Sequence, residues 1–265
     1  MSDDFSLQLT GGAAIIHVGT LLAVGSILHS LEFLSLHRAL GTQGLWQSGD
    51  LAEEVCRGPL SRRLVTLGFS PLFFQFAQAL RIVAAVLWIV EPGPFSIMAL
   101  LTIHVYTLIR FRGTFNGGSD SMMLYLLVLV AISQLGSHSE FSERVIAWSI
   151  TAILVVSYGR AGLAKIKQAN WRCGQSLNVF LGSSKYQGIA AIDSLRRSQA
   201  FLRIASWGII LFEVSFPTAL LSPSIAFLFV CAGVLFHLGN AAVFGLNRFL
   251  FAWISAYPAL LFCAF

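Results

Sequence analysis

The chain has 265 residues, of which 56% are hydrophobic and only 11% are charged, and its mean hydropathy is +0.77. Soluble domains carry about 25% charged residues, so this composition excludes an ordinary soluble protein and predicts an all-α integral membrane protein. The net charge of +5 is then a signal of membrane topology. We expect a lipid bilayer around the chain and no nucleic acid as a partner.

Apolar stretches long enough to cross a bilayer recur along the whole chain. We count eight, at residues 10–30, 73–91, 94–112, 121–136, 144–164, 201–221, 223–244 and 246–264. The short joins at residues 92–94, 222–223 and 245–247 predict antiparallel neighbours. The sequence therefore predicts a polytopic helical bundle of about eight transmembrane helices that forms a single domain over residues 1–265.

Two joins are longer than the rest. Residues 46–66 mix charged and apolar side chains, which predicts an interfacial amphipathic helix. Residues 166–200 are polar, and we expect them to form a loop with short helices over the mouth of the bundle. The first ten residues contain no base, so we expect the first span to be retained. Cys56 and Cys173 lie in these polar joins, where either free thiols or a disulfide is compatible with the sequence.

The basic residues are distributed very unevenly. Fourteen of the seventeen lie in the joins after the first, third, fifth and seventh spans, and the opposite side holds only Arg144. Arg81 and Arg160 fall inside spans. Because Lys and Arg concentrate in cytoplasmic loops, this asymmetry predicts that both termini are non-cytoplasmic.

Several spans also carry polar side chains at membrane depth. They are Gln75, Gln78 and Arg81 in the second span; His104, Thr107 and Arg110 in the third; Glu213 in the sixth; and His237 and Asn240 in the seventh. Each alone is typical of an interhelical hydrogen bond. Polar stripes on four helices must face one another or a shared cavity, because lipid cannot satisfy them. The sequence thus predicts an interior polar chamber.

The glycine-rich segment RFRGTFNGGSD joins the third and fourth spans. Its glycines allow a ligand to approach the backbone closely, and Asp120 begins the next helix. Asp120 can cap that helix or act in a site. Arg110 and Arg112, with Asn116 beside them, can hold an anionic group, or the arginines can serve as cytoplasmic anchors.

The stretch SYGRAGLAKIKQANWRCGQSLNVFL at residues 157–181 ends one span and leaves the membrane. Tyr158 and Lys165 are seven residues apart, which places them within about 20° of each other on a helix. A phenol and an amine on one face predict an acid–base site, with Arg160 and Trp171 close in sequence. Alternatively, Lys165 and Lys167 reach to the interface as anchors.

Three blocks, in order, are similar to a known family. FNGGSDSMMLYLLVLVAISQL, YGRAGLAKIKQANWRCGQSL and FHLGNAAVFGLNRFLFAWISAYPALLFC resemble the membrane segment of the vitamin K-dependent γ-carboxylases and their bacterial relatives, the HTTM family. This resemblance implies a helical bundle with an interior pocket, in a bacterial inner membrane, and a quinone or hydroquinone cofactor. It also implies that Lys165, or less directly Lys167, is the base that deprotonates the hydroquinone. A lysine desolvated in an apolar chamber can act in this way.

The chain also departs from the carboxylases. They carry a histidine in the first block, where this sequence reads Gly117–Ser119, and their large propeptide-binding domain has no counterpart. We therefore expect no complete γ-carboxylase. The sequence favours an enzyme or peptide-maturation factor, with the small sporulation-delaying protein B branch as one relative. Its catalytic residues would be Lys165, Asp120, Tyr158 and His237, and its substrate quinone-like or peptidic. A non-enzymatic membrane partner or a transporter subunit is the alternative.

Overall fold

The computed structural model describes residues 10–36, 38–40, 53–54, 58–111, 117–136, 138–182 and 190–265, except for the side chains of residues 190–192. Within these ranges the chain is almost entirely helical and has no strand, which confirms the predicted all-α class. Cys56, Arg112 and Asn116 lie outside the described residues, as do residues 46–52 and 55–57 of the predicted interfacial segment 46–66.

The helices divide into two compact units. We call Ile16–His138 the N-terminal unit, and Met1–Ile15 with Ser139–Phe265 the C-terminal unit. Helix α1 (Gly11–Ser35) begins in the latter and continues into the former. The other helices of the N-terminal unit are α3 (Pro59–Gly68), α4 (Pro71–Val90), α5 (Pro94–Arg110) and α6 (Gly117–Leu135).

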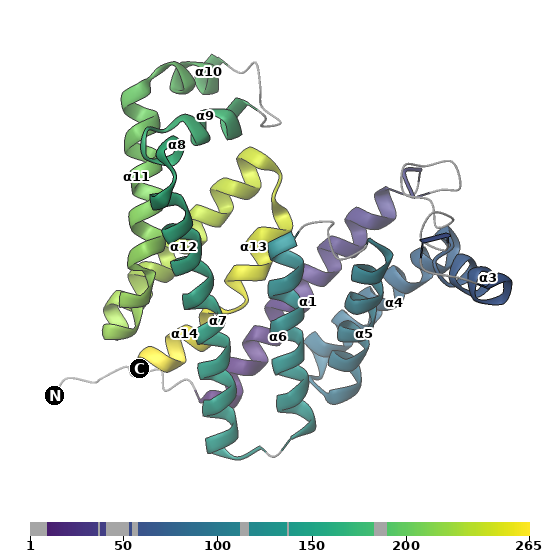
Figure 1. Cartoon of the computed structure of the whole chain (residues 1–265). Coiled ribbons are helices and arrows are strands. Elements are labelled where there is room, and N and C mark those ends of the chain that lie inside the picture. Colours follow the sequence, from purple (N-terminus) through teal and green to yellow (C-terminus); the bar gives the residue numbers. More distant parts are fainter. Residues whose placement is uncertain are drawn as a thin grey trace. The chain divides into compact units, whose positions relative to one another are not determined.

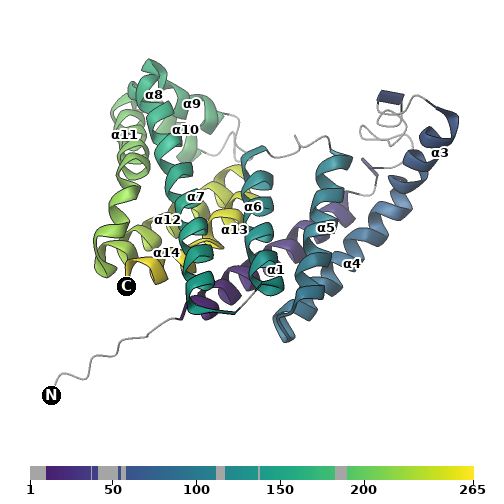
Figure 2. The same ribbon diagram turned by 60° about the horizontal axis from the view of Figure 1, so that its bottom comes forward.

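The C-terminal unit contains the remaining helices (Figure 1). They are α7 (Glu140–Lys167), α8 (Ala169–Arg172), α9 (Gln175–Gly182), α10 (Ala190–Arg197), α11 (Gln199–Ser215) with the 3₁₀ turn η1 (Phe216–Leu221), α12 (Pro223–Phe244), α13 (Asn247–Ile254) and α14 (Tyr257–Ala264). Helix α7 packs on α11 and α14, and α12 packs on η1, α13 and α14. The short helices α8 to α10 lie together along α11, at the end where α7 stops (Figures 1 and 2).

Local sequence signals explain where the long helices begin and end. Ser70 and Ser222 accept a backbone N–H at the starts of α4 and α12, and each is followed by a proline in the first turn. Gly245 ends α12 with a φ of 71°, a left-handed conformation that glycine adopts without a Cβ clash. Acidic residues in the first turn of α7 and lysines in its last turn complement the helix dipole.

Six described segments are long and apolar enough to cross a membrane. They are Gly11–Ser35, Pro71–Val90, Gly117–Leu135, Glu140–Lys167, Gln199–Leu221 and Pro223–Phe244. Helix α5 is apolar but has only 17 residues. The chain is thus an integral membrane helical bundle, and the count of eight spans stays a prediction.

The continuous eighth span expected over residues 246–264 is interrupted. Helix α13 ends at Ile254 and α14 begins at Tyr257, with Pro258 in its first turn. Proline has no backbone N–H and its ring clashes with the preceding turn, so it fits a helix start better than a helix interior. The interruption places Tyr257 at the start of a new helix.

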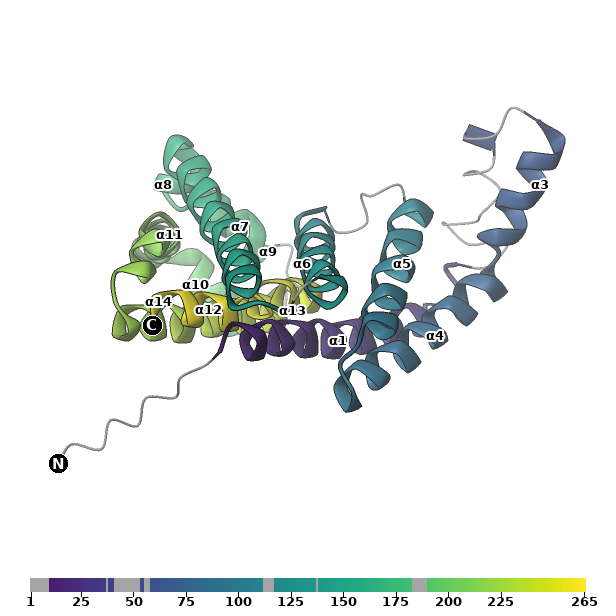
Figure 3. The same ribbon diagram turned by 90° about the horizontal axis from the view of Figure 1, so that it is seen from below.

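The N-terminal unit is built around an aromatic core. Phe33, Phe74 and Phe111 form it with Leu40, and their rings make edge-to-face and stacked contacts with centroids 5.2–5.8 Å apart. Tyr106 packs against this cluster and donates a hydrogen bond to the carbonyl of Gly68, 3.0 Å away. These contacts join α1, α4 and α5, and Figure 3 shows α4 and α5 side by side.

Candidate functional site

A cavity of about 480 Å³ lies within the C-terminal unit, among α7, α8, α9, α11, α12 and α13. This volume is in the range of small-molecule binding sites. Its apolar lining comes largely from six aromatic residues: Trp171, Phe180, Phe236, Phe244, Phe249 and Trp253. Its polar lining comes from Ser157, Tyr158, Lys165, Glu213, His237 and Asn240. Six polar side chains around a mainly aromatic space are typical of a site that orients an apolar ligand.

One wall of the cavity is a stack of flat rings from α12 and α13. Phe249 and Trp253 lie one helical turn apart, with centroids 4.2 Å apart and planes 13° apart. The His237 ring is stacked on Trp253 at 5.6 Å. The indole Nε1 of Trp253 donates to Ser157 Oγ, 3.0 Å away, which ties the stack to α7. This wall offers a planar ligand an extended aromatic face.

Lys165 and Glu213 form an ion pair at the cavity. Lys165 Nζ is 2.7 Å from both carboxylate oxygens of Glu213, and the two side chains are 20% and 5% exposed. The ammonium also lies 5.2 Å from the centre of the Trp171 ring, within cation–π range. Glu213 is therefore paired in a largely apolar setting, as buried charges require.

A glycine allows this pairing. A Cβ added at Gly162 would lie 2.7 Å from both the backbone nitrogen and Cγ2 of Val214. Only glycine permits α7 and α11 to approach so closely at this level. Lys165 follows Gly162 by one turn and Glu213 precedes Val214, so the close crossing brings the two charged groups together.

Tyr158 is the centre of a second polar group. Its hydroxyl oxygen is 2.6 Å from His237 Nε2 and 2.7 Å from the hydroxyl oxygen of Tyr257. All three residues are buried, and the Tyr158 ring stacks on Phe216 with centroids 4.0 Å apart. A Cβ at Gly233 would lie 2.1 Å from the Tyr257 hydroxyl oxygen, so this glycine leaves the space that the hydroxyl occupies.

The cavity thus brings together six of the residues selected from the sequence: Tyr158, Lys165, Trp171, Glu213, His237 and Asn240. The Asn240 carboxamide lines the cavity and makes no hydrogen bond with any described residue. Arg160 is not part of this group, since it is exposed on α7 and does not line the cavity.

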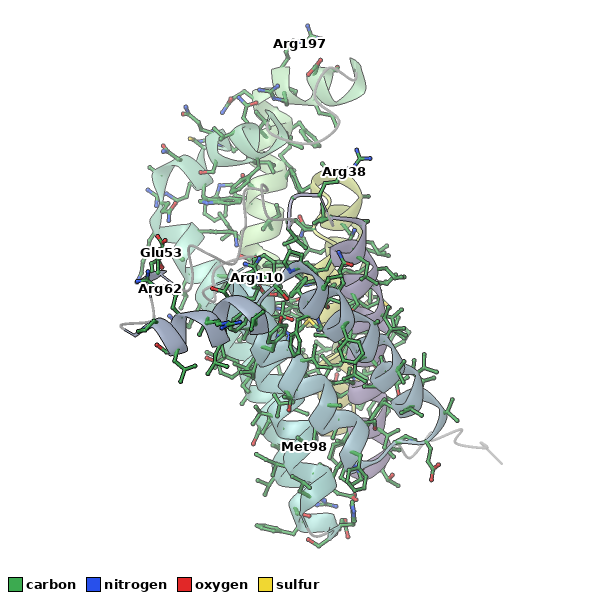
Figure 4. The ribbon with its side chains drawn as sticks, turned by 90° about the vertical axis from the view of Figure 1, so that its right-hand side faces the viewer. Arg38, Glu53, Arg62, Met98, Arg110 and Arg197 are labelled. Carbon is green, nitrogen blue, oxygen red and sulfur yellow. The ribbon has the colours of Figure 1, made fainter. Side chains whose placement is uncertain are left out.

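Four other selected residues, Arg81, His104, Arg110 and Asp120, belong to the N-terminal unit, and all are buried. His104 Nε2 is 2.9 Å from the carbonyl oxygen of Asp120, so this nitrogen carries the proton and donates it. His104 Nδ1 is then free to accept from Arg81 Nη2, 3.4 Å away, which also donates to Ser26. Figure 4 labels Arg110, the last residue of α5.

Besides the hydrogen bonds of Arg81, a second set of hydrogen bonds is centred on Gln78. Ser30 donates to the Gln78 side-chain oxygen at 3.1 Å, and the Gln78 side-chain nitrogen donates to Thr107 at 3.2 Å. These bonds connect α1, α4 and α5, as expected for polar residues that hold membrane helices together. In the N-terminal unit, the polar stripes therefore form an interhelical hydrogen-bond network.

Residues 122–265 match the model of the HTTM domain family, and this region contains every residue that lines the cavity. The chain belongs to the HTTM domain family. The match covers more than half of the sequence, which confirms the predicted membership of the HTTM family. No curated protein and no solved structure matches the chain significantly. Arg81, His104, Arg110 and Asp120 precede the matched region.

The residues in and beside the cavity that sequence reasoning did not select include Phe249, Trp253 and Tyr257. Phe249 and Trp253 are spaced four apart, which places them on one helix face, but an apolar span contains many such pairs. Tyr257 could have been found from the sequence, because it is a hydroxyl-bearing residue directly before Pro258 in a mainly apolar run.

The described residues contain no group of three or more His, Cys, Asp or Glu side chains that could hold a metal ion. Cys173 donates to the backbone carbonyl of Asn170, with sulfur and oxygen 3.5 Å apart. The disulfide that the sequence allows for Cys173 would pair it with Cys56, which lies outside the described residues. The functional groups in the cavity lining are the amine of Lys165, the carboxylate of Glu213, the hydroxyls of Ser157 and Tyr158, the imidazole of His237 and the amide of Asn240.

Proposed function

We propose that this HTTM protein is a membrane enzyme that removes a proton from the hydroxyl group of a flat, apolar substrate of the hydroquinone class. The observation that supports this proposal is an aromatic cavity with one ion pair, Lys165–Glu213, in its lining. Charged groups at membrane depth are costly and usually serve function. The aromatic wall of His237, Trp253 and Phe249 suits a planar ring, and the Asn240 carboxamide can bind one of its oxygens.

The ion pair acts as one unit in this proposal. The Lys165 ammonium already carries its full set of protons, so the group that can accept one is the Glu213 carboxylate. The substrate O–H bond breaks, and its proton passes to the carboxylate, directly or through Lys165, which gives one proton to Glu213 and takes one from the substrate. The substrate oxygen becomes an oxyanion, and the ammonium beside it stabilises that negative charge. Glu213 is thus a proton acceptor as well as a partner that holds the lysine.

The proposal also concerns the branch of the HTTM family to which the chain is related. The three blocks resemble the membrane segment of the γ-carboxylases, and the resemblance also implies a relation to a small, bacterial toxin-maturation branch of the same fold, the sporulation-delaying protein B type. We extend the proposal to a peptide-maturation factor of a bacterial inner membrane, with both termini non-cytoplasmic. The support is the strong bias of Lys and Arg to one set of joins. Arg197, the last residue of α10, lies in one of these Lys- and Arg-rich joins (Figure 4).

Binding and proton transfer can be measured separately with menadione, a methylated naphthoquinone, and its reduced form, menadiol. Trp171 and Trp253 line the cavity, so menadione bound there should quench their fluorescence saturably. Menadiol bound to the purified protein in nanodiscs, without oxygen, should show the absorption of its anion at a pH where free menadiol is neutral. Glu213→Gln should bind menadione but lose the anion signal, because its amide cannot accept the proton.

Arg144→Gln is the matched control, since it removes an exposed ion pair, Arg144–Glu140, that lies outside the cavity. We expect this variant to keep both signals. If wild-type protein does not quench with menadione, the substrate class is wrong. If menadiol binds to wild type and remains neutral, the cavity is a binding site and the proposed proton transfer is wrong.

A further inference from the structure

The hydroxyl group of Tyr158 has two polar neighbours, and the number of protons among the three groups is unbalanced. Tyr158 and Tyr257 each carry one hydroxyl proton, and a neutral imidazole at His237 carries one N–H. Only two contacts join the three groups, Tyr158 to His237 and Tyr158 to Tyr257. His237 Nδ1 is buried and has no partner among the described residues. Two contacts can use two of the three protons, so one donor is always left over.

The spare proton has three possible locations. If Tyr257 donates to Tyr158 and Tyr158 donates to His237, the spare proton is on Nδ1, which is buried without a partner. If instead His237 Nε2 donates to Tyr158 and Tyr158 donates to Tyr257, the spare proton is on Tyr257, which is buried and does not line the cavity. If Tyr257 and His237 Nε2 both donate to Tyr158, the spare proton is on the hydroxyl group of Tyr158, a residue that lines the cavity.

His237 and Tyr158 both line the cavity, but His237 Nδ1 is itself buried, and Tyr257 is not a lining residue. The third arrangement is therefore the one in which a bound molecule can best satisfy the spare donor. An unsatisfied buried donor is costly, and under-satisfied acceptors are tolerated better. Once a ligand accepts from Tyr158, the third arrangement leaves no donor of the three groups unsatisfied, and His237 Nδ1 is a lone pair without a partner among the described residues. Two protein donors would then point at one phenol oxygen, which makes the phenol a stronger hydrogen-bond donor to the ligand.

From this donor count we propose that the cavity recognises a hydrogen-bond acceptor, a carbonyl or oxyanion oxygen, at the Tyr158 hydroxyl, and that Tyr257 is the positioning residue that directs the Tyr158 proton toward it. The inference rests on the proposed function, because it concerns the same cavity. It adds a polarity requirement for the part of the ligand next to Tyr158. A planar ligand would then meet Tyr158 with an acceptor oxygen and the Lys165–Glu213 pair with an ionisable hydroxyl.

Tyr257→Phe tests this role while it preserves the ring. Without the second donor, Tyr158 can give its proton to His237 Nε2 and no longer needs a ligand acceptor. The measurement is the ratio of the dissociation constants of menadiol and menadione, since menadione presents only carbonyl oxygens. We expect Tyr257→Phe to reduce the preference for menadione roughly two- to tenfold, the range of one hydrogen bond. Tyr125→Phe, which removes an exposed hydroxyl on α6, should leave the ratio unchanged.

A wild-type comparison covers the case in which Tyr257→Phe does not fold. Methylnaphthalene has the rings of menadione and no oxygen, so we expect it to bind at least several-fold more weakly. Equal affinity for methylnaphthalene and menadione, or an unchanged ratio in a folded Tyr257→Phe variant, would overturn the inference while leaving the proposed function intact. Failure of wild type to bind menadione at all would instead remove the proposed function itself.

Discussion

The two units of this protein use buried polar groups in different ways. In the N-terminal unit, His104 has a partner for each ring nitrogen: it donates to Asp120 and accepts from Arg81. In the C-terminal unit, His237 has a partner among the described residues only at Nε2, and it lines a cavity. Both histidines are almost fully buried. The comparison teaches that the role of a histidine at membrane depth depends on its partners. The fully bonded His104 holds helices together, and the partly bonded His237 belongs to the lining of a cavity.

The prediction with the largest expected effect concerns the Lys165–Glu213 ion pair. It tests whether the two charged side chains depend on each other for stability. Lys165→Met leaves Glu213 without its partner, and we expect it to lower the free energy of unfolding by about 3 kcal/mol, the lower end for a buried pair because Lys165 is partly exposed. Adding Glu213→Gln should recover a large part of this loss, since the unpaired charge is then removed. Thermal and chemical unfolding of the single and double variants in detergent measures this cycle. Additive losses would mean that the two residues do not depend on each other.

The next prediction compares the two histidines directly. His104→Leu removes the acceptor of Arg81 and the donor to Asp120, so we expect a loss of about 2 kcal/mol in stability, the cost of unsatisfied buried groups. His237→Leu removes a single hydrogen bond, and we expect about half that loss together with weaker binding of menadione. Melting temperatures and quenching titrations of both variants provide the measurement. If His104→Leu impairs binding more than His237→Leu does, the division of roles between the units is wrong.

Much of the fold could be predicted from the sequence, because apolar runs and helix-ending residues act locally. The starts of α4 and α12 follow from Ser-Pro at 70–71 and 222–223. The break at Pro258 was missed because the surrounding composition is uniformly apolar, so hydropathy alone gives one continuous span. Composition measures the length of a span, and it does not report where the backbone turns inside it.

The candidate site could be predicted only in part, for a related reason. Lys165 and Tyr158 share a helix, so their common face follows from spacing, and Glu213, His237 and Asn240 were recognised as polar groups at membrane depth. Their pairing depends on which helices cross and at what level, which is a long-range property. Tyr257 and the division of polar stripes between two units depend on the same tertiary contacts, and no spacing along one helix encodes them.

The smallest expected effect concerns the glycines of α7, and it tests whether the helix crossing sets the site. Gly162→Ala places a Cβ 2.7 Å from Val214, so α7 and α11 must separate, and we expect a loss of about 1–2 kcal/mol, typical of overpacking. Gly159→Ala is the matched control one turn earlier, where nothing lies within 4 Å of an added Cβ. There, alanine should be neutral or stabilise by up to about 1 kcal/mol, because it favours the helix over the unfolded chain.

The two glycine variants also separate a local packing defect from a defect in the site. If the close crossing at Gly162 positions Lys165 against Glu213, then Gly162→Ala should weaken the menadiol anion signal beyond what its stability loss explains, while Gly159→Ala keeps the signal of wild type. The comparison is made at a temperature where both variants are fully folded. An unchanged anion signal in folded Gly162→Ala would mean that the flexible lysine side chain adjusts to the wider crossing, and that the pair is set by charge attraction rather than by the approach of the two helices.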